Sequence, residues 1–140
     1  TLFPYTTLFR SGIECLSRGA KSCTFVDISK ESIDIVKSNI KKARVESESI
    51  ILNLDFKTAI DKLKLQNSKF DIIFMDPPYY KNMFIEAIEK IDNSNLLNED
   101  GIIVVEHDTN DLFPDKICKL EKTRDKKYGN TTLTFYKMEA

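Results

Sequence analysis

Histidine and cysteine are scarce in this chain of 140 residues. His107 is the only histidine, which argues against histidine-dependent catalytic triads and multi-histidine metal sites. The three cysteines, Cys15, Cys23 and Cys118, are odd in number and lack any C-x-x-C spacing. Neither a disulfide framework nor a zinc site is therefore expected, and a reducing, cytoplasmic setting fits best.

Long apolar runs and a strong net charge are also lacking. No apolar run approaches the roughly 18 residues that a membrane helix needs, so no membrane partner is expected. The formal net charge of −1 and pI near 5.9 do not by themselves indicate a polyanion binder, since such proteins usually concentrate Lys and Arg. With 41% hydrophobic residues, the length fits one globular domain. No exposed apolar stripe is evident, so we expect a monomer.

The first eleven residues differ in character from the rest. They read TLFPYTTLFRS, with no clear hydrophobic period, and match one translated frame of a common short-read sequencing adapter. Stretches of this kind do not belong in fold reasoning. We therefore expect residues 1–11 not to be native and residues 12–140 to form one incomplete domain.

From Gly12 onward, short apolar runs alternate with helical periodicity, which predicts βαβ units and a mostly parallel α/β sheet. A first helix should end before Gly19, and Ser29 should cap the next helix, which runs to Ala43. The other predicted helices are 56–65 and 82–91, and the predicted strands are 22–27, 50–54, 70–75 and 101–106. Two further strands, 117–122 and 131–137, flank a charged, turn-rich stretch with Gly129 and Asn130, so an antiparallel hairpin should finish the sheet.

The sharpest local signal is Asp76-Pro77-Pro78-Tyr79, directly after the apolar strand FDIIFM. The carboxyl end of a parallel strand is where open α/β sheets bind ligands. Two prolines fix the backbone and remove two N–H donors, which leaves carbonyl oxygens as acceptors. The Asp76 carboxylate and the Pro77 carbonyl could hold both hydrogens of an exocyclic amino group. Tyr79 offers a face on which an unstacked base can rest. The alternative is a strand-terminating turn with Tyr79 in the core.

Two other acids follow predicted strands. Asp27 ends the strand 22–27, and an acid at this position commonly accepts hydrogen bonds from ribose hydroxyls. Asp55 comes directly after the strand 50–54 and could face an adenine amino group. Taken alone, an acid at such a position is more often a turn or helix-cap residue. Together with Asp76 they predict a nucleotide-type site at one edge of the sheet.

The motifs also carry a family resemblance. In order they read G-I-E-C-L-S-R-G-A-K-S from Gly12, then F-V-D, F-D-I-I-F-M-D-P-P-Y, G-I-I-V-V-E-H and Y-G-N-T-T-L-T-F-Y. This series resembles the RsmD-type 16S rRNA guanine-N2 methyltransferases. The resemblance implies a class I, Rossmann-like fold and methyl transfer from S-adenosylmethionine to guanine N2 of 16S rRNA or the small ribosomal subunit. It implies that Asp76, Pro77, Pro78 and Tyr79 form the catalytic loop. It also implies that Asp27, Asp55 and Gly12 contact the cofactor.

The chain departs from this family at its beginning. Such enzymes carry a strand ending in D-L-F-A-G-T-G before the segment that starts at Gly12. In that register the acid falls on Phe3 and the two loop glycines fall on Thr7 and Phe9. Glycines there permit close backbone approach to the cofactor. We therefore expect the first strand and the glycine loop to be largely missing, cofactor binding to be poor and the fold to be weakened.

Several other functions are compatible with the same residues. The nearest is another amino methyltransferase, acting on DNA adenine, transfer RNA guanine or a protein glutamine. A nicotinamide-dependent oxidoreductase could use Asp27 on its ribose, and fold alone does not exclude it. However, Asp76-Pro77-Pro78-Tyr79 has no evident role in hydride transfer. A non-catalytic RNA-binding module is disfavoured by balanced charge and by the absence of interleaved aromatic and basic residues.

Overall fold

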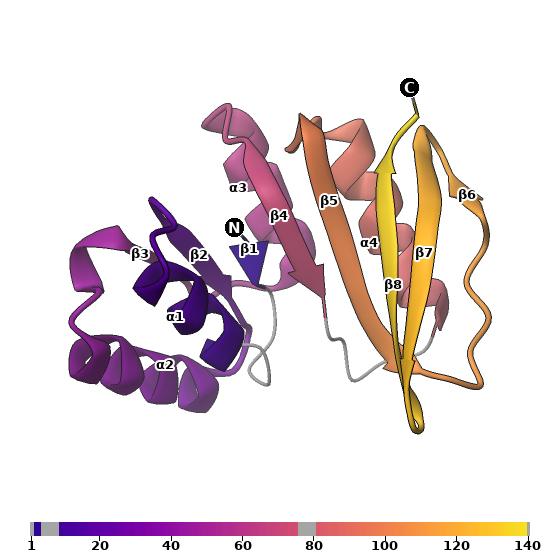
Figure 1. Cartoon of the computed structure of the whole chain (residues 1–140). Coiled ribbons are helices and arrows are strands. Elements are labelled where there is room, and N and C mark those ends of the chain that lie inside the picture. The colour runs from indigo at the N-terminus through magenta and orange to yellow at the C-terminus, as the bar shows by residue number, and fades with distance from the viewer. Residues whose placement is uncertain (1, 4–8, 76–80, 140) are drawn as a thin grey trace.

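A computed structural model describes residues 2–3, 9–75 and 81–139, which form an eight-stranded sheet with helices on both faces (Figure 1). The strand order is β3-β2-β1-β4-β5-β8-β7-β6. The strands are β1 (Leu2–Phe3), β2 (Cys23–Val26), β3 (Ser49–Leu52), β4 (Phe70–Met75), β5 (Leu97–Asp108), β6 (Lys116–Ile117), β7 (Leu120–Tyr128) and β8 (Thr131–Met138). The helices are α1 (Phe9–Ser17), α2 (Lys30–Ala43), α3 (Phe56–Leu65) and α4 (Lys81–Asn93), with a 3-10 turn at Glu46–Glu48.

The sheet has a parallel part and an antiparallel part. Strands β1 to β5 pair in parallel, whereas β8, β7 and β6 extend the sheet in antiparallel register beyond β5. This arrangement confirms the predicted α/β sheet that finishes in an antiparallel hairpin. All five parallel strands end at the same edge, which we call the carboxyl edge.

The two faces of the sheet bury two hydrophobic clusters. Phe25 packs with Leu16 of α1 and Val36 of α2 on one face. Its neighbour Val26 belongs to the other cluster, which contains Ile60 of α3 and residues of α4. Because successive side chains of a strand point to opposite faces, the two clusters lie on opposite sides of the sheet. Helices α1 and α2 therefore cover one face, and α3 and α4 cover the other.

A two-residue strand holds the centre of the parallel part. Leu2 of β1 pairs with Thr24 of β2 and with Ile73 of β4, and Phe3 pairs with Phe25. This is the position at which a strand was predicted to be largely missing. The residues that resemble an adapter thus supply a strand there, but one much shorter than its neighbours.

The hairpin differs from the sequence prediction. The stretch after Lys122 was predicted to be turn-rich, yet β7 continues through it to Tyr128, and only Gly129 and Asn130 form the turn. Gly129 has a φ of 60°, which glycine adopts without strain. The prediction was wrong because cross-strand pairing with β8 outweighs the low strand propensity of charged residues. The predicted strand 117–122 is divided between β6 and β7, and 101–106 lies within the longer β5.

Local signals set the helix boundaries as predicted. The Ser29 hydroxyl accepts a hydrogen bond from the Ser32 amide at 3.3 Å and so caps α2. After α1, Gly19 has a φ of 105° and its amide bonds to the carbonyl of Leu16. The segment from α1 into β2 therefore turns at the predicted glycine.

Candidate active site

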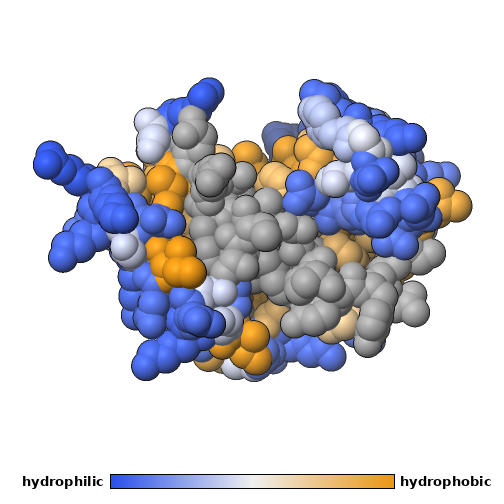
Figure 2. Space-filling model, turned by 90° about the horizontal axis from the view of Figure 1, so that it is seen from below, coloured by the Kyte–Doolittle hydropathy of each residue, from blue (hydrophilic) through white to orange (hydrophobic). Residues whose placement is uncertain are grey.

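The carboxyl edge gathers the residues that end β2, β3, β4 and β5. Figure 2 views the molecule from below, the side on which β4 and β5 end in Figure 1, and shows hydrophilic flanks with hydrophobic residues reaching the surface between them. Open parallel sheets bind ligands along this edge. The predicted site residues Asp27, Asp55 and Asp76 each follow one of these strands in sequence.

Asp27 directly follows β2 and is buried, with 8% of its surface exposed. Its Oδ1 atom accepts a hydrogen bond from the Ser29 amide at 2.8 Å. This bond uses one of the two carboxylate oxygens and fixes the side chain at the entry of α2. Asp27 is thus held rigidly at the position predicted for a ribose-binding acid.

Asp55 is exposed and caps α3. Its Oδ1 accepts the Thr58 amide at 3.0 Å, and its Oδ2 accepts the Thr58 hydroxyl at 2.6 Å. These bonds hold the pKa of the Asp55 carboxyl below its usual value. The predicted strand before Asp55 ends earlier, at Leu52. The structure therefore assigns Asp55 a capping role, and its predicted contact with adenine stays a prediction.

Two residues at this edge were missed by the sequence reading. The Asn53 side chain donates to the carbonyls of Asp27 and Ile28, at 3.0 and 3.1 Å, and so ties the end of β3 to the end of β2. Ile28 is 67% exposed beside the buried Asp27. An exposed apolar side chain next to a strand-end acid could cover one face of a bound nucleoside. The signal available in the sequence was the D-I dipeptide after an apolar strand.

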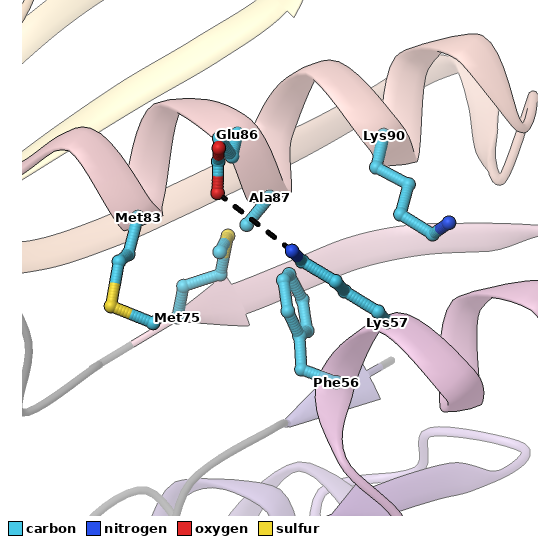
Figure 3. A pocket seen from close by; sticks show the side chains of 7 residues that line it. All are labelled: Phe56, Lys57, Met75, Met83, Glu86, Ala87 and Lys90. Carbon is cyan, nitrogen blue, oxygen red and sulfur yellow. Dashed lines mark ion pairs between the residues drawn. The ribbon is translucent and has the colours of Figure 1, made fainter.

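Asp76, Pro77, Pro78 and Tyr79 lie outside the described residues. Met75, the residue directly before Asp76, is fully buried and ends β4, and α4 begins at Lys81. A small pocket lies between α3 and α4 at this end of β4 (Figure 3). Phe56, Met75 and Met83 give it an apolar lining, and the Lys57 ammonium lies 4.0 Å from the Glu86 carboxylate beside it. Its volume of about 40 Å³ suits water rather than a cofactor.

Gly12 packs where α1 approaches β2. A Cβ atom at this position would lie 2.5 Å from Cε1 of Phe25 and 3.1 Å from Sγ of Cys23. The absence of a side chain therefore lets the helix lie directly on the strand. The structure gives Gly12 a packing role, and its predicted cofactor contact stays a prediction.

His107 lies inside the hairpin region and not beside Asp27 or Asp55. It is 8% exposed, and its ring stacks on Phe113 at 4.2 Å between centroids. Within residues 9–75 and 81–139, no group of three or more His, Cys, Asp or Glu side chains is placed to hold a metal ion. No helix in the same described ranges has the length and apolar character of a membrane span.

Comparison with known families decides the assignment. The family model described as Conserved hypothetical protein 95 matches residues 10–137. The chain belongs to this family, the RsmD-type methyltransferases. The family resemblance predicted from the motifs is thereby confirmed.

Relatives of the RsmD family are longer than this chain. YlbH of Bacillus subtilis (strain 168), provisionally named an rRNA methyltransferase, is 36% identical over 126 residues, which cover 90% of this chain and 68% of YlbH. Ribosomal RNA small subunit methyltransferase D of Haemophilus influenzae is 33% identical over 98 residues, covering 68% of this chain and 49% of the relative. The chain thus spans about half to two thirds of these relatives.

Solved structures show the same fold. A conserved hypothetical protein of Streptococcus pyogenes matches with a TM-score of 0.89 at 31% identity, covering 99% of this chain and 84% of that chain. Methylase HI0767 of Haemophilus influenzae, also provisionally named, matches with a TM-score of 0.82 at 26% identity, covering 99% and 86%. The predicted class I methyltransferase fold is confirmed. As a member of the RsmD family, the chain is an S-adenosylmethionine-dependent methyltransferase.

Proposed function

We propose that this RsmD-type enzyme methylates the exocyclic N2 of a guanine in 16S rRNA, as a cytoplasmic monomer acting on the small ribosomal subunit or its RNA. One observation carries the proposal. Strand β4 ends at buried Met75 and leads directly into Asp76-Pro77-Pro78-Tyr79, at the edge where Asp27 follows β2. The names of the relatives, which refer to rRNA methylation, support the substrate class.

The residues present fit the cofactor in part. Asp27 is buried and fixed at the end of β2, with the apolar Ile28 exposed beside it, as a ribose and an adenine ring would require. The acid and glycines of the family's first loop are replaced by Phe3, Thr7 and Phe9. We therefore propose that residues 1–11 are not native, and that the chain as given binds the cofactor weakly.

The chemistry expected of the catalytic loop follows from its acceptors. S-adenosylmethionine supplies an electrophilic methyl group when it is bound. The exocyclic amino group is a poor nucleophile because its lone pair is delocalised into the ring. In the proposed role, the Asp76 carboxylate and the Pro77 carbonyl each accept a hydrogen bond from one N–H of the amino group. These bonds favour a pyramidal nitrogen whose lone pair points at the methyl group. Transfer would break the bond between the methyl carbon and the cofactor sulfur, form the N–C bond and leave S-adenosylhomocysteine, while the nitrogen would lose one proton, for which Asp76 is the proposed base.

The test is transfer of labelled methyl from S-adenosylmethionine to unmethylated small-subunit rRNA particles. The enzyme should be the chain with a family-like N-terminus restored, compared with its Asp76→Ala variant. Incorporation at guanine N2 that disappears in Asp76→Ala supports both the substrate and the loop. A folded, cofactor-binding protein that fails to modify these particles but modifies DNA adenine, transfer RNA or protein glutamine would contradict the 16S assignment. The nicotinamide-dependent alternative is set aside because the family is one of methyltransferases.

A further inference from the structure

A second pocket, of about 200 Å³, lies at the hairpin end of the carboxyl edge. It is formed where β5 ends, by the loop that follows β5 and by the paired strands β7 and β8. Its lining includes Thr109, Asp111, Leu112, Phe113, Lys127 and Thr132. We call it the hairpin pocket.

The hairpin pocket lies near the start of α4, the helix that follows the proposed catalytic loop in sequence. Its wall residue Phe113 makes an edge-to-face contact with Phe84, with ring centroids 5.3 Å apart. Phe84 lies in the first turn of α4, which begins just after residues 76–80. In the sheet, β8 lies two strands from β4, which corresponds to roughly 10 Å. A strand of RNA whose target base reached Asp76 could therefore place a neighbouring nucleotide in this pocket.

Charges at the pocket mouth are mixed. The Lys122 ammonium is already paired with Asp115 at 3.4 Å and with Asp125 at 3.2 Å. Lys127 and Asp111 remain at the mouth, one cation and one carboxylate. A phosphate pocket would present cations without a facing acid, whereas the edge of a nucleobase carries both donors and acceptors. The charges thus favour a base over a phosphate.

The pocket also has an exposed apolar residue, Leu112, which we call the shelf, and a floor formed by Thr109 and Thr132. Leu112 is 79% exposed at the lining, although an apolar side chain gains nothing from this position in the free protein. The floor is held by the Thr109 and Thr132 hydroxyls, which lie 2.8 Å apart, and by the Thr109 hydroxyl bond to the Gly129 carbonyl at 3.3 Å. A preformed pocket of this kind costs little to order on binding.

We propose that the hairpin pocket binds an unpaired nucleoside of the RNA substrate, next to the nucleotide that is methylated. The base rests on Leu112 and Phe113, and its edge meets Lys127 and Asp111. This inference rests on the proposed function, because it takes its ligand class from the RNA substrate. It adds a specificity site on the strand that flanks the target.

The experiment measures binding of a fluorescently labelled, unstructured RNA oligonucleotide to the chain by anisotropy, without cofactor, with duplex RNA of the same sequence as competitor. Two matched pairs of variants separate the pocket from general effects. Lys127→Gln changes the pocket, whereas Lys126→Gln removes the same charge from the next residue, which lies on the other face of β7 against Tyr128. Leu112→Ser changes the shelf, whereas Leu65→Ser alters an equally exposed leucine at the end of α3.

Lys127→Gln and Leu112→Ser should each weaken single-strand binding by roughly tenfold and reduce the preference over duplex, since base stacking contributes strongly to such sites. Lys126→Gln and Leu65→Ser should leave both quantities within about twofold. Equal effects within each pair, or no RNA binding by the folded chain, overturn the inference. The methyl-transfer assay separates the two proposals. Activity that depends on Asp76 but has the same KM for RNA in Leu112→Ser contradicts the pocket alone, and pocket-dependent binding without methyl transfer contradicts the methylation proposal alone.

Discussion

The Nε2 atom of His107 lies 2.6 Å from the hydroxyl of Thr134, which itself donates a 2.6 Å hydrogen bond to the Asp125 carboxylate. The Nδ1 atom of the same ring lies 2.8 Å from the carbonyl oxygen of Asp108. A hydroxyl carries one proton, and Thr134 gives it to Asp125. The Thr134 hydroxyl therefore links the buried His107 ring to the Asp125 carboxylate across the hairpin.

Thr134→Val should destabilise the protein, because it removes this hydroxyl and keeps nearly the same volume. Thr134 is fully buried and His107 is 8% exposed, so the His107 ring would lose a partner that water replaces poorly. We expect the free energy of unfolding, measured with urea, to fall by about 1–3 kcal/mol. Thr131→Val on the same strand, outside this network, is the control. Equal losses in the two variants would show that the hydroxyl bridge contributes nothing specific.

Asp125→Asn should make the free energy of unfolding depend less on pH at acid pH. Burial raises the pKa of Asp125, but the hydrogen bonds from Thr134 and Lys122 and the charge of Lys122 outweigh it and hold the pKa below the usual 3.8. A carboxyl with a lowered folded-state pKa stabilises the protein above its unfolded value and loses that contribution as pH falls through the folded-state value.

Unfolding free energies should therefore be measured from neutral pH to below pH 4, because the usual pKa of an aspartate carboxyl is 3.8. The wild-type chain should lose stability across the acid part of this range, whereas Asp125→Asn should start lower and change less. Glu121→Gln, an exposed acid on the same strand, controls for the loss of one charge. Parallel curves for the wild-type chain and Asp125→Asn would contradict the role given to this carboxylate.

Gly12→Ala should destabilise the chain even without any ligand. The added methyl group would lie 2.5 Å from the fully buried ring of Phe25, so the ring or the helix would have to shift. We expect a loss of about 1–3 kcal/mol in thermal or urea unfolding, typical of an overpacked core. The double variant with Phe25→Leu should regain part of that loss, and Ser17→Ala on an exposed position of α1 should change little. A stable Gly12→Ala protein that has lost only cofactor affinity would instead favour the predicted cofactor contact.

The sequence predicted the parallel part of the fold well, because its signals are local. The apolar run FDIIFM, the cap Ser29 and the stop at Gly19 each specify a neighbouring segment without reference to distant residues. Asp27 could likewise be placed at a strand end from the run before it. Confirmation of these elements shows that propensity and tertiary packing agree along this half of the chain.

The antiparallel part of the sheet could not be predicted from local sequence signals. Its strand β7 is almost entirely polar, and only pairing with β8 makes it a strand. That pairing places the Arg124 guanidinium 4.9 Å from the ring centroid of Phe135 on β8, whereas the Lys126 ammonium lies 5.3 Å from the ring centroid of Tyr128 on the same strand. The contact of Arg124 with Phe135 is thus a pairing of a basic and an aromatic residue that forms only across the strands. The hairpin pocket likewise brings together Leu112 and Lys127, which are distant in sequence, so local sequence patterns could not predict it.

Asp55→Ala and Asp55→Asn should separate the capping role from a cofactor role. Both oxygens of Asp55 accept from Thr58 at the start of α3, so alanine removes the cap whereas asparagine keeps an acceptor for the Thr58 amide. We expect Asp55→Ala to lower Tm by a few degrees and Asp55→Asn to lower it less. If Asp55 only caps the helix, S-adenosylmethionine affinity should be equal in the two folded variants. A large loss of affinity in Asp55→Asn with an unchanged Tm would instead identify a cofactor contact.

Phe3→Asp, Thr7→Gly and Phe9→Gly, made together, should strengthen cofactor binding. They return the family's acid and loop glycines to the segment around β1, which the chain now forms with only Leu2–Phe3. Glycine permits the close backbone approach that bulky residues obstruct. Calorimetric titration with S-adenosylmethionine should show a gain of at least roughly tenfold, or about 1.4 kcal/mol. Asp27→Ala in the restored chain should reverse this gain, since the loop and the ribose acid hold the same molecule. Micromolar affinity in the chain as given would contradict the claim that its first eleven residues impair the site.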